Sequence, residues 1–118
     1  MPILNPSDAT VHVTVAEPTT NVDGTPLTDL ADVKVYYHTG TGPEAVVALG
    51  ATTPQGGGIL RTDIIADVAA GEVKTIYAQA IAINKLGLES ARSTESSLLI
   101  DRTAETRVPA APGPVTLF

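Results

Sequence analysis

Two histidines are the most versatile chemical groups of the chain, because imidazole can act as a base or bind a metal near neutral pH. His12 and His38 each stand at an outward position of a segment in which apolar and polar residues alternate. Neither has a histidine or glutamate partner at His-x-His or Glu-x-x-His spacing. The absence of cysteine excludes thiolate catalysis and Cys-ligated zinc. We therefore interpret both histidines as solvated side chains and expect no metal site at them.

Oxygen-bearing side chains gather in one loop, where Asn21, Asp23, Asp29 and Asp32 could offer ligands to calcium. The EF-hand pattern, however, needs its glycine two residues later than Gly24 and a bidentate glutamate further on. Asn and Asp also hydrogen-bond to the nearby backbone and so build turns. The sequence therefore favours Asx turns that order this loop over a calcium site.

No other motif indicates catalysis. The triple glycine at 56–58 precedes a predicted strand, so it does not open a helix whose amides could hold phosphate. The serines lack a nucleophile elbow and a His/Asp partner pattern. We predict that the protein is not an enzyme and binds no cofactor.

Charge and hydropathy restrict the class of partner. The formal net charge is −6 at pH 7, and the seven basic residues are scattered, so binding to a phosphate backbone has little electrostatic support. The sequence contains neither a transmembrane-length apolar run nor a recognisable secretory signal. Charged residues make up 17%, a low share that fits either a surface covered by a neighbour or a threonine-rich β-sandwich. We expect protein partners, with no nucleic acid and no membrane.

Period-two alternation predicts strands throughout the chain, and no helix is convincing. Val11, Val13 and Val15 alternate with polar residues until Pro18, and a turn-rich loop then leads to the next alternating run. The expected strands cover 11–15, 33–38, 44–49, 59–65, 73–83 and 89–100. Six short strands about ten residues apart predict an antiparallel β-sandwich.

Three segments resemble fibronectin type III domains, especially those of bacterial and phage proteins. They are Val11–Thr19, Asp23–Leu30 leading into Val33–Tyr37, and Ala82–Asn84 with Gly87, Glu89, Ser90 and Ser93. The resemblance spans about residues 10–101. It implies an all-β, immunoglobulin-like antiparallel sandwich. The residues outside that span are expected to form an N-terminal stub at 1–9 and an extended proline-rich C-terminal tail at 102–118.

The chain departs from that family in its core. Val15 stands where the family usually has a core tryptophan, and the family's corner tyrosine aligns with Ile76, next to Tyr77. The register of 73–83 therefore stays open. In the unshifted register Ile76 points inward and Tyr77 outward, whereas a one-residue bulge exchanges the two faces.

In the unshifted register, the outer sheet face is unusually apolar and suits docking to a protein partner. The residues expected on this face are Lys34, Tyr36, His38, Tyr77, Gln79, Ile81 and Ile83.

The tail is a second candidate contact. Only nine residues precede Thr10, whereas Pro109–Leu117 resembles the Pro-x-x-Pro opening of the family's first strand. Three explanations stay open: the tail begins a second domain, folds back in cis, or is donated to a neighbouring subunit. The expected tail contacts are Pro109, Pro112, Pro114, Val115, Leu117 and Phe118.

We expect a bacteriophage virion protein, either a capsid-decorating or a tail-associated subunit, that assembles in the host cytoplasm into an oligomer or lattice. Phage release by lysis reconciles a fibronectin-like module with the absence of an export signal. The alternative is an extracellular spacer or carbohydrate-binding accessory module of a secreted bacterial enzyme or adhesin. It ranks lower because no tryptophan is available to stack on sugar. A third class, an adhesion domain, would use the loops at 21–30 and 84–88.

Overall fold

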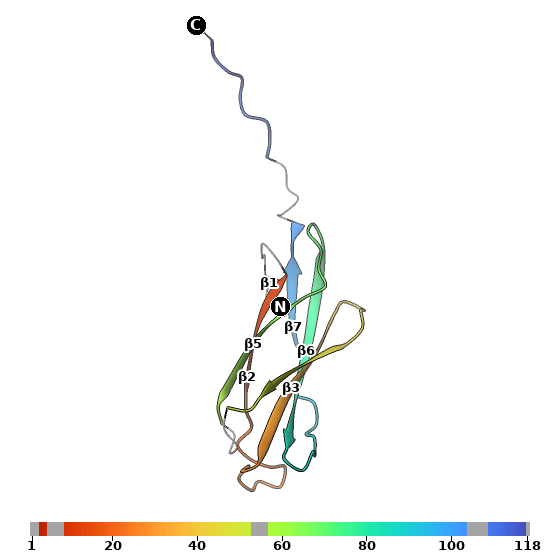
Figure 1. Cartoon of the computed structure of the whole chain (residues 1–118). Helices are drawn as coiled ribbons and strands as arrows, with labels where there is room; N and C mark the ends of the chain where they lie inside the picture. Colours follow the sequence, from red (N-terminus) through yellow and green to blue (C-terminus); the bar gives the residue numbers. More distant parts are fainter. Residues whose placement is uncertain (1–2, 5–8, 53–56, 104–108, 118) are drawn as a thin grey trace.

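Two β-sheets make up the folded part of the chain (Figure 1). The computed structural model describes residues 3–4, 9–52, 57–103 and 109–117, so Gly56 and Phe118 lie outside the described residues. The strands are β1 (Ile3–Leu4), β2 (Thr10–Ala16), β3 (Leu30–Thr39), β4 (Ala45–Gly50), β5 (Ile59–Ile65), β6 (Val73–Asn84) and β7 (Ser96–Asp101). One sheet has the order β1-β7-β6-β3-β4 and the other pairs β2 with β5. The prediction of an all-β fold with two antiparallel sheets is confirmed.

The sheets pack face to face over two clusters of apolar side chains. One cluster joins Val11 and Ile64 of the two-stranded sheet to Ile100 of the five-stranded sheet. The other joins Leu60 of β5 to Val33 of β3. Alternation along each strand directs these residues to the same interior, and their removal from water supplies the main driving force for folding.

The pairing of β3 with β6 settles the register of the longest strand. Val35 lies opposite Ala80, and Tyr36 lies opposite Gln79, with no irregularity between Tyr36 and Thr39. Directly opposite residues share a sheet face, so Ala80 faces inward with the buried Val35. The register is therefore the unshifted one, and Tyr77 faces outward.

The last predicted strand is shorter than expected. The sequence predicts 89–100, but β7 begins only at Ser96. Before it, Ser90 and Ser93 donate their amides to the carbonyls of Ala82 and Ala80, and their hydroxyls accept the amides of these two residues. Ser90 and Ser93 are three positions apart, whereas their partners Ala82 and Ala80 are only two positions apart. A regular ladder advances by the same number of residues on both strands, so this segment cannot form one. Side-chain hydroxyls replace the missing ladder bonds.

Replacing Ser93 by alanine is expected to lower the free energy of unfolding by about 1 kcal/mol, because the amide of Ala80 loses its acceptor. Urea denaturation monitored by circular dichroism measures the change. The matched control is Ser96→Ala at an exposed position, which is expected to change stability by less than about 0.5 kcal/mol. Equal effects of both substitutions would contradict this role of the Ser93 hydroxyl.

The structure also contains a strand that the alternation pattern did not predict. β1 pairs in parallel with β7, with Ile3 opposite Leu99 and Leu4 opposite Ile100. The stub expected at 1–9 thus contributes two residues to the edge of the larger sheet. A two-residue strand carries no detectable periodicity, which explains why the sequence did not indicate it.

Candidate functional site

The structure places the seven predicted face residues together on the outer side of β3 and β6. The cross-strand pairs are Lys34 with Ile81, Tyr36 with Gln79 and His38 with Tyr77, while Ile83 lies opposite Asp32. These side chains are half-buried, except that Ile81 is only 6% exposed. Ile81 therefore offers little apolar area for docking, and Ile83 and the aromatic rings provide most of it.

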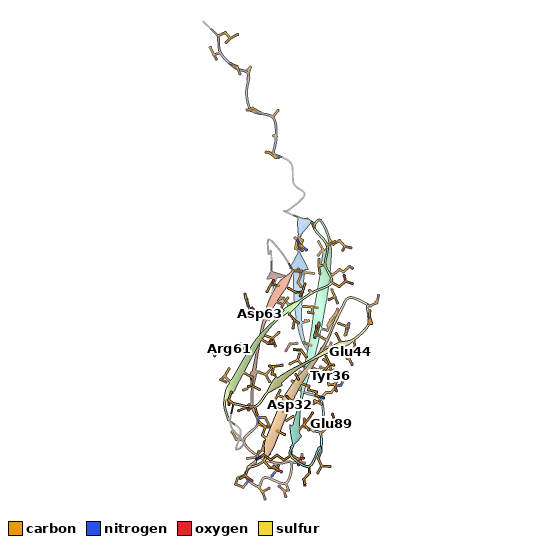
Figure 2. The ribbon with its side chains drawn as sticks, in the orientation of Figure 1. Asp32, Tyr36, Glu44, Arg61, Asp63 and Glu89 are labelled. Atoms are coloured by element: carbon orange, nitrogen blue, oxygen red, sulfur yellow. The ribbon has the colours of Figure 1, made fainter. Side chains whose placement is uncertain are left out.

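A cluster of rings and charges organises this face. The rings of His38 and Tyr77 stack with their centroids 5.0 Å apart. The guanidinium of Arg92 lies 4.2 Å from the ring centroid of Tyr36 and donates to both carboxylate oxygens of Glu44 at 2.8 and 2.9 Å. Tyr36 and Glu44 are labelled in Figure 2. Cation–π contact and a forked ion pair together hold Arg92 flat against the sheet.

The electrostatics agree with this geometry. The hydrogen bond from Arg92 lowers the pKa of Glu44, and the same bond raises the pKa of Arg92. Sequence reasoning missed this contact because 48 positions separate the two residues, and a strand pattern does not indicate which residues of distant segments meet. Aromatic rings flanked by a fixed cation suit protein contacts, because Tyr and Arg are enriched among the residues that dominate binding energy.

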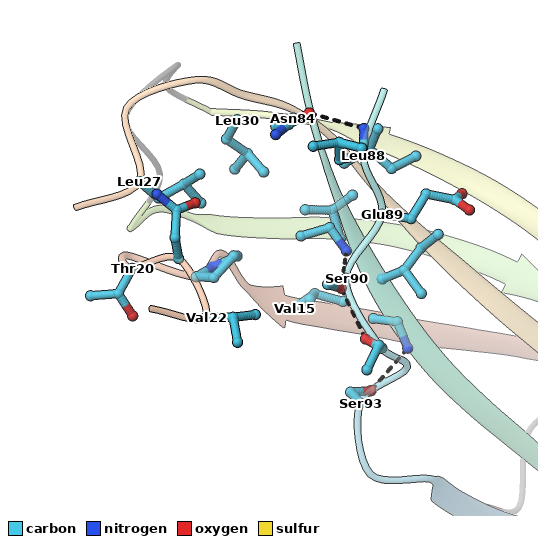
Figure 3. Close-up of a pocket in the computed structure, with 18 of the residues that line it drawn as sticks. Val15, Thr20, Val22, Leu27, Leu30, Asn84, Leu88, Glu89, Ser90 and Ser93 are labelled. Atoms are coloured by element: carbon cyan, nitrogen blue, oxygen red, sulfur yellow. Dashed lines mark hydrogen bonds between the residues drawn. The ribbon is translucent and has the colours of Figure 1, made fainter. Parts of the chain in front are cut away.

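A second candidate surface is an apolar groove between the ends of the two sheets (Figure 3). Its volume is about 680 Å³. Val15 of β2 forms one wall, Ala80 and Ala82 of β6 form the other, and Leu27 closes the end with the loop that follows β2. Val15 is the position at which the sequence predicted a core without its largest anchor. Small side chains on both walls leave the space between the sheets unfilled.

The outer edge of β2 borders this groove. Ala9 accepts a hydrogen bond from the amide of Ala66, and the amide of Glu17 donates to Gly58, both at 2.9 Å. Because bonding alternates along an antiparallel strand, the intervening residues His12, Thr14 and Ala16 turn their amides and carbonyls away from β5. No strand of the described chain pairs with this edge.

The tail lies apart from both sheets. Residues 109–117 form no strand, and every one of them is exposed, with Val115 at 84% and Leu117 at 89%. The tail leaves from the end of the molecule at which β7 ends, opposite the end formed by the loops after β2 and β6 (Figure 1). The predicted tail contacts from Pro109 to Leu117 are therefore available to another molecule.

The remaining polar candidates form local structure. In the loop after β2, Asp23 accepts hydrogen bonds from the hydroxyl and amide of Thr25, which lower the pKa of Asp23. Asn21 donates to the same hydroxyl, so the predicted Asx turn is confirmed. His12 is exposed and lies 2.6 Å from the carboxylate of Asp63. Within the described ranges, no three His, Cys, Asp or Glu side chains are placed to hold a metal ion.

Glu17 is a buried acid that the sequence did not single out. It is 5% exposed and accepts hydrogen bonds from the amide and hydroxyl of Thr52 and from the amide of Gly58, at 2.6 to 2.8 Å. Burial raises the pKa of Glu17, but these hydrogen bonds outweigh it and leave the pKa below its ordinary value. Glu17 thus ties the end of β2 to the chain segments on either side of residues 53–56.

Comparison with known proteins does not place the chain in a family. No protein-family model matches it, and neither a curated protein nor a solved structure shows a significant match. The described residues include no helix with the length and apolar character needed to cross a bilayer.

Proposed function

We propose that this chain is a non-enzymatic structural module that joins protein subunits of a bacteriophage particle, as a capsid-decorating or tail-associated protein. One observation carries the proposal: the apolar tail at 109–117 stands exposed beyond the sandwich. Exposed apolar side chains such as Val115 and Leu117 gain free energy when a partner covers them. The outer face of β3 and β6 is the second contact of the proposed subunit.

The proposal includes an immunoglobulin-like, fibronectin type III-like fold. Its support is the strand order, because β7-β6-β3 opposite β2-β5 corresponds to strands G-F-C opposite B-E of the immunoglobulin sandwich. The hydrogen-bonded serines beside β6 lie in one of the three segments that carry the resemblance.

The virion assignment rests on the arrangement of the two contact surfaces. A subunit of a lattice or tube must meet neighbours on more than one side. The tail extends beyond one end of the sandwich, whereas the ring cluster around Tyr36 and Arg92 lies on a sheet face. Two separate surfaces of this kind fit repeated assembly better than a single binary complex.

The test compares the full chain with a variant that lacks residues 108–118. We expect the full chain to form species several times its 12.1 kDa mass, and the shortened chain to remain monomeric. Size-exclusion chromatography with light scattering measures the mass, and electron microscopy shows whether the species are rings, tubes or particle-bound subunits. A full chain that stays monomeric and does not sediment with phage particles would overturn the proposal and favour a spacer.

The sheet face is tested with Tyr36→Ala, because the ring of Tyr36 lies on the outer side of β3 under Arg92 and does not line the groove. We expect assembly at least about tenfold weaker, as for an interface residue whose truncation costs more than about 1 kcal/mol. The control is Ile65→Ala, at a 69% exposed isoleucine on the other sheet. If Tyr36→Ala and Ile65→Ala assemble equally well, the outer face of β3 and β6 is not a contact.

A further inference from the structure

We propose that the tail of one copy of this chain adds as a strand to the outer edge of β2 in a second copy and fills the apolar groove beside it. The inference rests on the proposed assembly function and identifies its partner as a second copy. Strand addition provides affinity through main-chain hydrogen bonds and specificity through side-chain pockets. The structure offers both at the same place.

The first argument is the incomplete cover of β2. Its inward residues Val13 and Val15 pack on the core but remain half-buried. The amide and carbonyl of Ala16 are directed outward at the groove, and those of Thr14 are directed outward further along the same edge. A two-stranded sheet with an open edge is a template for one more strand.

The second argument is the chemistry of the tail. Pro109, Pro112 and Pro114 oppose a helix and favour an extended course. Val115 and Leu117 are two positions apart, so in a strand their side chains lie on one face. Proline is tolerated as the first residue of a strand, which makes Pro114–Leu117 the segment suited to pair with β2.

The third argument is that one register satisfies both sets of constraints. In an antiparallel arrangement with Val115 beside Val15, Leu117 lies beside Val13 and both side chains enter the interior. Thr116 then lies beside Thr14, whose amide and carbonyl point toward the added strand, and Pro114 accepts the amide of Ala16 at the first position. A shift by one residue would direct Val115 and Leu117 to solvent.

The fourth argument is direction. The tail leaves the molecule where β7 ends, and its base is fixed because Arg102 exchanges backbone hydrogen bonds with Gly71 and Glu72. The groove opens at the opposite end, beside the loops that hold Val22 and Leu88. A tail from a copy stacked beyond that end enters antiparallel to β2. A tail that folded back on its own sandwich would run parallel to β2, which is the weaker pairing.

Head-to-tail contacts of this type do not close on themselves unless a rotation brings the last copy to the first, so they generate rings or open chains. Each copy acts as donor at one end and acceptor at the other. A copy that cannot accept a tail can therefore still donate its own, and a copy without a tail can still accept one. Mixing the two kinds of copy provides a complementation test.

The test uses an acceptor-blocked copy, Thr14→Pro, and a donor-deleted copy that lacks residues 108–118. Proline at position 14 removes an amide directed away from β5, so the ladder between β2 and β5 is kept. We expect each variant alone to be monomeric and their mixture to form a 1:1 complex that grows no further, as measured by light scattering. Arg61→Pro, which removes an outward amide of β5, is the matched control and is expected to assemble like the unmodified chain.

Several outcomes overturn the inference. A Thr14→Pro chain that remains folded by circular dichroism and assembles like the unmodified chain shows that the tail binds elsewhere, while the proposed assembly function stands. Two variants that stay separate when mixed also contradict strand addition. Binding of the groove to a different phage protein, with no binding to the tail, identifies another occupant. A full chain that is monomeric by itself contradicts the inference. The proposed function is then decided separately: it stands if the chain sediments with phage particles and fails if it does not.

The register has its own measurement, because the chain contains no cysteine. Oxidation of a donor-competent Thr116→Cys copy with a donor-deleted Thr14→Cys copy is expected to join them by a disulfide. Opposite residues of a hydrogen-bonded pair have Cα atoms about 5.5 Å apart, within the range for a disulfide. Thr62→Cys, on β5, replaces Thr14→Cys in the control. Equal cross-linking of both acceptors would contradict the register.

Discussion

Replacing Ile100 by alanine is expected to lower the free energy of unfolding by about 2–5 kcal/mol, because the lost side chain leaves a cavity in close-packed surroundings. Ile100 is 0% exposed and belongs to the cluster that joins β7 and β6 to Val11 and Ile64 of the other sheet. It also lies opposite Leu4 in the pairing of β1 with β7. The change therefore removes core packing between the two sheets.

Urea denaturation of the full chain measures this loss. Ile65→Ala is the matched control, since it deletes the same atoms from a strand residue that is 69% exposed, and we expect a change within about 0.5 kcal/mol. Similar midpoints for Ile100→Ala and Ile65→Ala would show that the interior near β7 is not close-packed.

Replacing Glu17 by glutamine is the second substitution with a large expected effect, a loss of about 1–3 kcal/mol at neutral pH. The carboxylate accepts two amides and one hydroxyl from Thr52 and Gly58, and hydrogen bonds to a buried charged group are stronger than neutral ones. Glutamine keeps the shape of the side chain but offers one acceptor oxygen in place of two. Denaturation at neutral pH measures the loss.

The same residue predicts a pH dependence. Because the pKa of Glu17 is lowered in the folded protein, its contribution to stability is complete above its unfolded pKa and is lost as pH falls through the folded pKa. Glu17→Gln is therefore expected to flatten the decline of stability on acidification. Glu95→Gln, at an exposed position, is the control. An unchanged acid decline in Glu17→Gln would mean that other carboxylates cause it.

Sequence patterns located most of the fold because alternation is a local property. The strands around Val35 and Ile64 follow from period-two patterns on two-sided sheets, whereas the direction of Tyr77 stayed open in the sequence until the pairing of β3 with β6 settled it. The prediction of a strand over 89–95 is wrong, because a Ser- and Thr-rich composition is compatible with a strand as well as with a loop. The structure uses the hydroxyls of Ser90 and Ser93 as hydrogen-bond acceptors for β6, and composition does not distinguish this role from that of a ladder strand.

The candidate site was predictable only in part, for a related physical reason. Alternation predicted which residues share the outer face of β3 and β6, but not that Arg92 would cross it to reach Glu44. The groove depends on small side chains from both sheets, such as Val15 and Ala82, whose proximity is a matter of tertiary packing. Composition shows that the chain is rich in small residues, but it does not show which of them lie opposite one another between the two sheets.

The parallel pairing of β1 with β7 has a mechanical consequence. Tension applied to the two ends of the chain pulls β1 and β7 in opposite directions along their common axis, so the hydrogen bonds between them are loaded together in shear. In an antiparallel hairpin pulled from its open end, the bonds instead break one at a time. The Ile3–Leu99 and Leu4–Ile100 pairs, supported by the buried Ile100, thus act as the first barrier to stretching of the molecule. In a copy held at its N-terminus and pulled at its tail, β7 therefore transmits the force into this two-residue pairing with β1.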